Sequence, residues 1–116
     1  MITRKVIKGT GRGKYLSFPT VNLRYFKTDK IKFGVWAVLV QYKDKEYKGA
    51  AFVGPVPTFN IKTPRIEIHI FNFSKNLYNK KIRVRFLKYL RPAKKFKNPQ
   101  TLVRQIKEDC NKILIK

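Results

Sequence analysis

The sequence predicts a small, mainly β domain that ends in one α-helix. Short stretches with alternating apolar residues are separated by Asn, Asp, Gly and Pro, and the apolar period becomes helical near residue 98. The length of 116 residues and the 43% apolar content suit one folded domain, which we expect over residues 1–116. Short antiparallel strands followed by one helix predict a small closed barrel or a sandwich.

The clearest expected strand is the apolar stretch 34–42. Both of its alternating faces are apolar, as in a strand buried on both sides. A shorter strand is expected over 3–7, and 46–53 follows a Lys-Asp-Lys turn as a hairpin partner. We exclude 54–59 as a central strand because its two prolines lack the N–H that a sheet requires.

Two further strands are expected in the second half of the chain. In the stretch 65–73, one face carries three isoleucines, and the other carries Glu67, His69 and Phe71. Tyr78-Asn79 predicts a turn, and 81–86 alternates inward apolar with outward arginine residues. The final helix is expected from Asn98 as N-cap, and its apolar face consists of Leu102, Ile106, Cys110, Ile113 and Leu114.

A glycine-rich basic segment leads into Pro-Thr-x-Asn over residues 9–23. Its alternate glycines allow close approach of backbone N–H groups to an anion, and Arg12 and Lys14 add positive charge. The spacing fits neither a Walker loop nor a dinucleotide-binding fingerprint. We therefore interpret the segment as a different phosphate-binding and metal-binding loop.

The charge of the chain is strongly positive. Its 28 Lys and Arg residues against six Asp and Glu residues give a formal net charge of +22, which favours an anionic partner. The lysines flank nearly every expected turn, which suits a generally cationic surface. The single cysteine excludes an internal disulfide, and we expect a cytoplasmic protein because the sequence shows neither a membrane span nor a signal peptide.

The segment 9–23 resembles the signature of the riboflavin kinase (flavokinase) family. The Gly-Arg-Gly, the leucine and the Pro-Thr-x-Asn are present, whereas Ser17 and Val21 stand where the family has glycine and alanine. Further matches are Gly54 with Pro-Thr-Phe at 57–59, the Glu67 and His69 strand, and Leu-Arg-Pro at 90–92. Phe52 replaces a family asparagine, and Ala93 replaces a glutamate.

The resemblance implies a six-stranded antiparallel Greek-key barrel with a C-terminal helix, acting as a stand-alone kinase. It implies Glu67 as the catalytic base and Thr20 and Asn22 as ligands of Mg²⁺. It places the nucleotide, ATP or another NTP, on Gly9, Gly11, Gly13, Lys14, Thr20, Ile70, Asn72 and Tyr78, and riboflavin on Arg91, Lys94 and Phe96. The products would be FMN and ADP, and we expect a monomer.

The alternative is a non-enzymatic basic barrel that binds single-stranded nucleic acid through charge and exposed aromatic rings. Such a barrel is expected to gather lysines and aromatic residues on one face of its sheet. A kinase instead requires Glu67, Thr20 and Asn22 to converge. The kinase is the interpretation that we adopt, with no nucleic acid and no membrane as partner.

Overall fold

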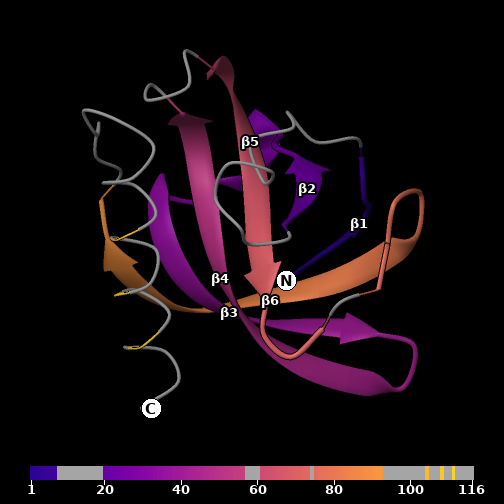
Figure 1. Ribbon diagram of the computed structural model, residues 1–116. Coiled ribbons are helices and arrows are strands. Elements are labelled where there is room, and N and C mark those ends of the chain that lie inside the picture. Colours follow the sequence, from indigo (N-terminus) through magenta and orange to yellow (C-terminus); the bar gives the residue numbers. More distant parts are fainter. Residues whose placement is uncertain are drawn as a thin grey trace.

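One sheet of six antiparallel strands coils into a nearly closed barrel in the computed structural model of the chain (Figure 1). The structure describes residues 1–7, 20–56, 61–73 and 75–92, together with Arg104, Glu108 and Asn111. The elements are β1 (Ile2–Lys5), β2 (Val21–Arg24), the 3-10 helix η1 (Lys27–Asp29), β3 (Gly34–Tyr42), β4 (Lys45–Val56), β5 (Ile61–Ile70) and β6 (Lys81–Arg91).

The strand order in the sheet is β1-β6-β3-β4-β5-β2. The strands β3, β4 and β5 follow one another in sequence and in space, and β6 returns to the free edge of β3. The two edge strands, β1 and β2, contact each other and thereby bring the ends of the sheet together. The predicted mainly β fold, a small antiparallel barrel, is confirmed.

The core lies on one face of the coiled sheet. Side chains that alternate along the strands point into it, as the period of two requires. Its most buried members are Leu23, Val38, Val40, Val53, Ile66, Ile68, Ile82 and Val84. A second, smaller apolar cluster lies on the opposite face, where Phe71 packs with Ala37, Ala50 and Leu90.

The strand 34–42 has the predicted bounds, and the turn at Tyr78-Asn79 is confirmed, with Asn79 at a φ of 71°. The first strand begins and ends earlier than 3–7, although Ile7 still forms an isolated bridge. The last strand runs five residues beyond the predicted end at Phe86 and reaches Arg91.

The predicted bounds of β4 and β5 are wrong: β4 extends beyond residue 53, and β5 begins at Ile61 rather than at residue 65. Strand β4 continues through Pro55 to Val56, although the prolines led us to exclude 54–59. The register between β4 and β5 shifts between Gly54 and Val56, so Pro55 occupies an irregular position that does not require its missing N–H. Strand β5 ends at Ile70 rather than at residue 73, because Asn72 adopts a left-handed turn conformation with a φ of 56°.

The helix expected from Asn98 lies outside the described residues, apart from Arg104, Glu108 and Asn111. These three residues are helical and exposed. Among the residues that the structure describes, no helix is long and apolar enough to cross a membrane.

Candidate active site

Strands β2 and β5 place Asn22 directly opposite Glu67. The two residues are cross-strand partners in the antiparallel register, so their side chains leave the sheet on the same face. They are the two buried polar residues of the described chain, with exposed fractions of 5% for Asn22 and 3% for Glu67. Burying a carboxylate and an amide costs free energy of folding, and such buried polar groups cluster at functional sites, so this pair marks a candidate site.

The same register continues across five strands. Asn22 pairs with Glu67, Glu67 with Phe52, Phe52 with Val35, and Val35 with Arg91. Directly opposed residues of an antiparallel sheet share a face, so this row carries the amide and the carboxylate on one side. The register between β3 and β6 shifts beside Val35, so the row gives the position of Arg91 at its end and not the face of its side chain. The sheet therefore connects the predicted metal ligand, the predicted base and the predicted flavin-binding arginine.

The amide of Asn22 suits a bound cation. Its Oδ1 atom is buried and accepts no hydrogen bond within the described part of the chain. An unsatisfied buried acceptor is unfavourable, and a hard cation that prefers oxygen ligands would satisfy it. Thr20 lies just before β2 and is half-buried. The described residues contain no group of three or more His, Cys, Asp and Glu residues placed to hold a metal, so an ion here would need further ligands from water and phosphate.

The chain just before the glycine-rich segment is bonded to this site. The N–H of Ile7 donates to the carbonyl oxygen of Asn22 at 2.8 Å, which closes the segment between them. The N–H of Val6 donates to the carbonyl oxygen of Lys80 at 2.9 Å, and the N–H of Asn79 donates to the carbonyl oxygen of Val6 at 3.0 Å. Val6 and Ile7, the last described residues before the segment, therefore lie beside Asn22 and the turn at 78–79.

Some predicted ligand-binding residues lie outside the described residues. These are Gly9, Gly11, Gly13 and Lys14 in the loop and Lys94 and Phe96 after β6. Arg91 is the last residue of β6, and its Nη1 donates to the carbonyl oxygen of Pro92 at 3.0 Å.

The three remaining nucleotide-binding candidates lie at different places. Tyr78 is 54% exposed in the turn bonded to Val6, and its N–H donates to Asn76 Oδ1 at 2.9 Å. Asn72 is exposed in the turn after β5. The side chain of Ile70 belongs to the core, on the face opposite Glu67. A contact between Ile70 and the nucleotide would therefore have to use main-chain atoms, and it stays a prediction.

His69 lies on the same face of β5 as Glu67. Its ring makes an edge contact with the ring of Phe71 at a centroid distance of 5.4 Å. The predicted structural role of His69 agrees with this packing.

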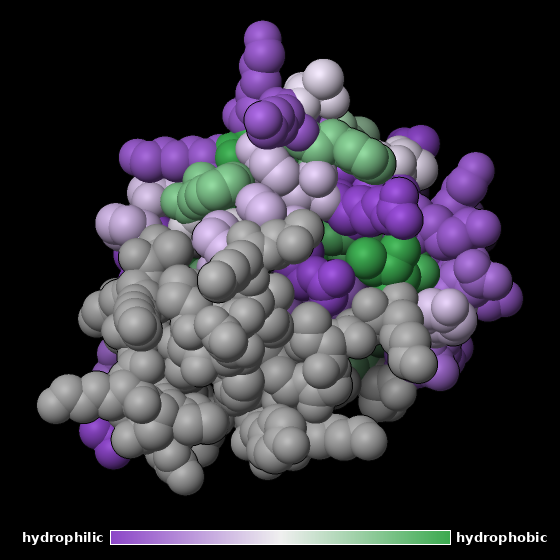
Figure 2. All heavy atoms as spheres, turned by 90° about the horizontal axis from the view of Figure 1, so that it is seen from above, coloured by the Kyte–Doolittle hydropathy of each residue, from purple (hydrophilic) through white to green (hydrophobic). Residues whose placement is uncertain are grey.

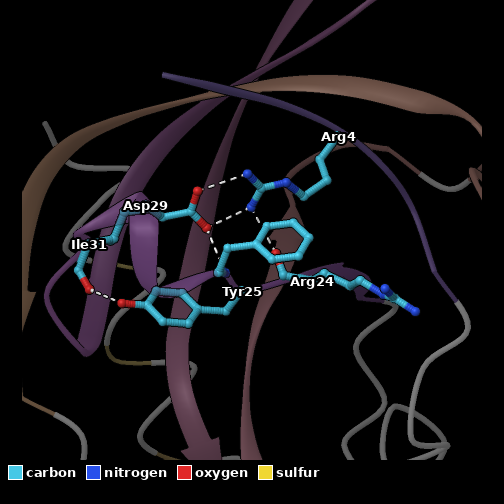
Figure 3. Close-up of polar contacts among 6 residues, drawn as sticks. Arg4, Arg24, Tyr25, Asp29 and Ile31 are labelled. Atoms are coloured by element: carbon cyan, nitrogen blue, oxygen red, sulfur yellow. Dashed lines mark hydrogen bonds and ion pairs between the residues drawn. The ribbon is translucent and has the colours of Figure 1, made fainter.

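An ion pair that the sequence pattern did not indicate joins β1 to the segment after β2 (Figure 3). Arg4 Nη1 and Nη2 donate to Asp29 Oδ2 and Oδ1, both at 2.8 Å. Arg4 also donates to the carbonyl oxygen of Arg24, and the N–H of Phe26 donates to Asp29 Oδ2 at 2.9 Å. The hydrogen bond from Arg4 is the main cause of a lowered pKa of the Asp29 carboxyl group. This clamp fixes the start of β1 against the exit of β2.

Arg65 is a second residue that was missed. It precedes Glu67 by two positions on β5 and so lies on the same face, and its Nε is buried with no hydrogen-bond acceptor among the described residues. The alternation that placed Glu67 opposite the isoleucines also applies to Arg65, so the signal was present in the sequence.

The fold and the described part of the site define a small antiparallel barrel that carries a buried carboxylate beside a buried amide. The family model for flavokinase, described as riboflavin kinase, matches residues 1–115. The chain therefore belongs to the riboflavin kinase family, and the resemblance deduced from its motifs is confirmed.

Individual proteins agree with this family. The bifunctional riboflavin kinase/FMN adenylyltransferase of Haemophilus influenzae is 36% identical over 106 residues, covering 90% of this chain and 34% of that protein. The RNA-binding riboflavin kinase RibR of Bacillus subtilis is 31% identical over 112 residues, covering 96% of this chain and 48% of that protein. The chain spans less than half the length of each.

A solved structure has the same fold. It is described as a macrolide-efflux protein from Streptococcus pneumoniae, with a TM-score of 0.79 and 31% identity. The match covers 94% of this chain and 36% of that one.

Proposed function

We propose that this chain is a riboflavin kinase. It transfers the γ-phosphoryl group of ATP, or of another nucleoside triphosphate, to the ribityl 5′-hydroxyl of riboflavin and yields FMN and a nucleoside diphosphate. The observation that carries the proposal is the pairing of Asn22 with Glu67 on adjacent strands, in a chain of this family.

The reaction requires positioning more than covalent chemistry. The ribityl oxygen forms a bond to the γ-phosphorus as the bond from phosphorus to the β,γ-bridging oxygen breaks. Glu67 accepts the hydroxyl proton. Its place on a buried central strand holds the carboxylate in one orientation, which favours proton transfer to it.

The divalent ion, in our proposal Mg²⁺, neutralises the charge of the phosphates when it is bound. The residues that would hold it are Thr20 and Asn22, which are two positions apart at the start of β2, a spacing that puts both side chains on one side of an extended chain. The buried, unsatisfied Oδ1 of Asn22 supports this assignment. Two neutral oxygen ligands suit Mg²⁺, which usually keeps several waters and takes other ligands from phosphate.

The substrates would occupy the two sides of this pair. The nucleotide would contact the glycine-rich loop through Gly9, Gly11, Gly13 and Lys14 and reach Ile70, Asn72 and Tyr78. Riboflavin would contact Arg91, Lys94 and Phe96. Arg91 supports this arrangement because it shares the row of Glu67 across the sheet. We further propose one kinase domain over residues 1–116, acting as a cytoplasmic monomer.

Binding of single-stranded nucleic acid is the second candidate, because the chain has a charge of +22 and its relative RibR is described as RNA-binding. The described surface does not favour it. The exposed aromatic residues Phe26, Phe33 and Tyr78 come from connections and a turn rather than from one sheet face. On the face shown in Figure 2, the hydrophilic side chains of the described residues lie at several separate places and not in one stripe.

The deciding experiment measures FMN formation from riboflavin with Mg²⁺ and each nucleoside triphosphate in turn. We expect Glu67→Gln to lower the rate by about 10²- to 10⁴-fold, the usual contribution of a general base. Glu46→Gln is the matched control, because Glu46 is an exposed carboxylate of β4 and should leave the rate unchanged. A folded parent protein that forms no FMN with any nucleotide, or a Glu67→Gln variant as fast as the parent, would contradict the proposal.

A further inference from the structure

Two arginines lie opposite each other beside the candidate active site. Arg24 on β2 and Arg65 on β5 are direct cross-strand partners, one alternation away from the pair Asn22 and Glu67. All four side chains therefore leave the sheet on the same face. Like charges directly opposite each other are unfavourable, so this position calls for a negatively charged group.

Glu67 shares the face of Arg65 on β5, but no ion pair within the described chain joins Arg24 or Arg65 to a carboxylate. The ion pairs among the described residues join Asp29 to Arg4 and Glu46 to Arg85 instead. The guanidinium of Arg24 extends away from the clamp between Arg4 and Asp29 (Figure 3). The Nε of Arg65 is buried without an acceptor in the described chain, although a buried unsatisfied donor of a charged group is costly.

A buried hydrogen-bond acceptor and a buried hydrogen-bond donor lie on this face. Among the described residues, the buried acceptor Asn22 Oδ1 receives no hydrogen bond and the buried donor Arg65 Nε makes none. The two residues lie on neighbouring strands, which are about 4.8 Å apart, with an offset of two residues, or roughly 6.8 Å. A phosphoryl group bound to a divalent ion would satisfy both atoms, the ion contacting Asn22 and a phosphate oxygen contacting Arg65.

We propose that Arg65 binds the phosphoryl group that is transferred, and after the reaction the phosphate of FMN. This inference rests on the proposed kinase function. The acceptor oxygen must lie within hydrogen-bond reach of Glu67, so the phosphorus that bonds to it lies next to Glu67. Arg65 and His69 flank Glu67 on the same face of β5, and Arg65 is the one of the two with a long cationic side chain that can reach a phosphate. The Nε–H and one Nη–H of a guanidinium together match two phosphate oxygens.

The experiment compares the affinities of the protein for riboflavin and for FMN, measured separately by flavin fluorescence. Riboflavin lacks the phosphate, so Arg65→Gln should leave its Kd unchanged and raise the Kd of FMN about 10- to 100-fold, as for the loss of a hydrogen bond to a charged group. Arg65→Lys should recover part of the FMN affinity, because Lys keeps the charge without the planar fork. Arg83→Gln, an exposed arginine of β6 with the same charge change, is the matched control.

The outcomes separate this inference from the kinase function. If the parent forms FMN but the ratio of the Kd for FMN to the Kd for riboflavin is the same in Arg65→Gln and in the control, the proposed role of Arg65 is wrong. The proposed kinase function would still stand. Equal weakening of riboflavin and FMN also overturns it, because that result indicates a structural role. A parent that neither binds a flavin nor forms FMN overturns both. If Arg65→Gln does not fold, Arg65→Lys is used in its place. An unchanged ratio of the Kd for FMN to the Kd for riboflavin in Arg65→Lys would then overturn the inference.

Discussion

The clamp between Arg4 and Asp29 predicts a large and pH-dependent loss of stability in Asp29→Asn. The Asp29 carboxylate accepts hydrogen bonds from Arg4 at 2.8 and 2.8 Å and from the Phe26 N–H at 2.9 Å. Its side chain is 7% exposed, and that of Arg4 is 19% exposed. Asparagine removes the charge and turns an N–H₂ donor toward a donor, so we expect the free energy of unfolding to fall by about 2–4 kcal/mol at pH 7.

The sign of the pH dependence follows from the lowered pKa of Asp29, which the hydrogen bond from Arg4 causes. Around pH 3 to 4 the unfolded chain binds more protons at this residue than the folded chain, so stability rises with pH there. The contribution is complete above the unfolded pKa of about 3.9 and is lost as the pH falls through the lower folded pKa. The difference between parent and Asp29→Asn should therefore shrink below about pH 4.

Urea unfolding followed by the fluorescence of Trp36, at pH values from 3 to 7, measures this difference. Glu46→Gln serves as control, because its partner Arg85 lies 3.8 Å away and both side chains are more than half exposed. Its effect should stay within about 0.5 kcal/mol at every pH. An equal loss in both variants, or a loss in Asp29→Asn that does not change with pH, would refute the reasoning.

Two further predictions concern the site and the barrel. Asn22→Leu should raise the Mg²⁺ concentration for half-maximal FMN formation at least about tenfold. The midpoint temperature of thermal unfolding should stay equal or rise, because the substitution removes a buried acceptor that has no hydrogen bond among the described residues. A lower midpoint with an unchanged Mg²⁺ dependence would contradict the metal assignment. Gly34→Ala should cost roughly 2–4 kcal/mol in urea unfolding, because Gly34 has a φ of 145° and an added Cβ would lie 2.4 Å from the carbonyl oxygen of Arg91. A loss of unfolding free energy below about 0.5 kcal/mol would contradict this prediction, because it would mean that β3 and β6 can move apart at Gly34 at little cost.

The sequence pattern predicted which face of β5 each side chain occupies. Alternation placed Ile66, Ile68 and Ile70 on one face and Glu67 and His69 on the other, and the burial of the isoleucines agrees. The alternation of apolar residues and the residues typical of turns are local features of the sequence, so both can be recognised without the structure. The boundaries failed where geometry overrode local preference, as at Pro55, where a register shift tolerates the missing N–H.

The pairing of Asn22 with Glu67 was not predictable from the pattern alone. The two residues are 45 positions apart in the numbering, and their opposition depends on which strand lies next to β5 and in which register. The resemblance to a family indicated both residues without indicating how they meet. The clamp between Arg4 and Asp29 was missed for the same reason, since it joins side chains separated by 25 positions in a connection without periodicity.

The row of cross-strand partners explains why the departure at Phe52 bears on the site. Phe52 lies between Glu67 and Val35 in the row that ends at Arg91, at a position where the family has asparagine. A half-buried ring there offers no hydrogen bond from its side chain and adds an apolar neighbour to the carboxylate. Asn22, Arg65 and His69 then remain as the polar side chains beside Glu67 on β2 and β5. An apolar wall on one side and polar groups on the other would orient the carboxylate toward the phosphoryl group.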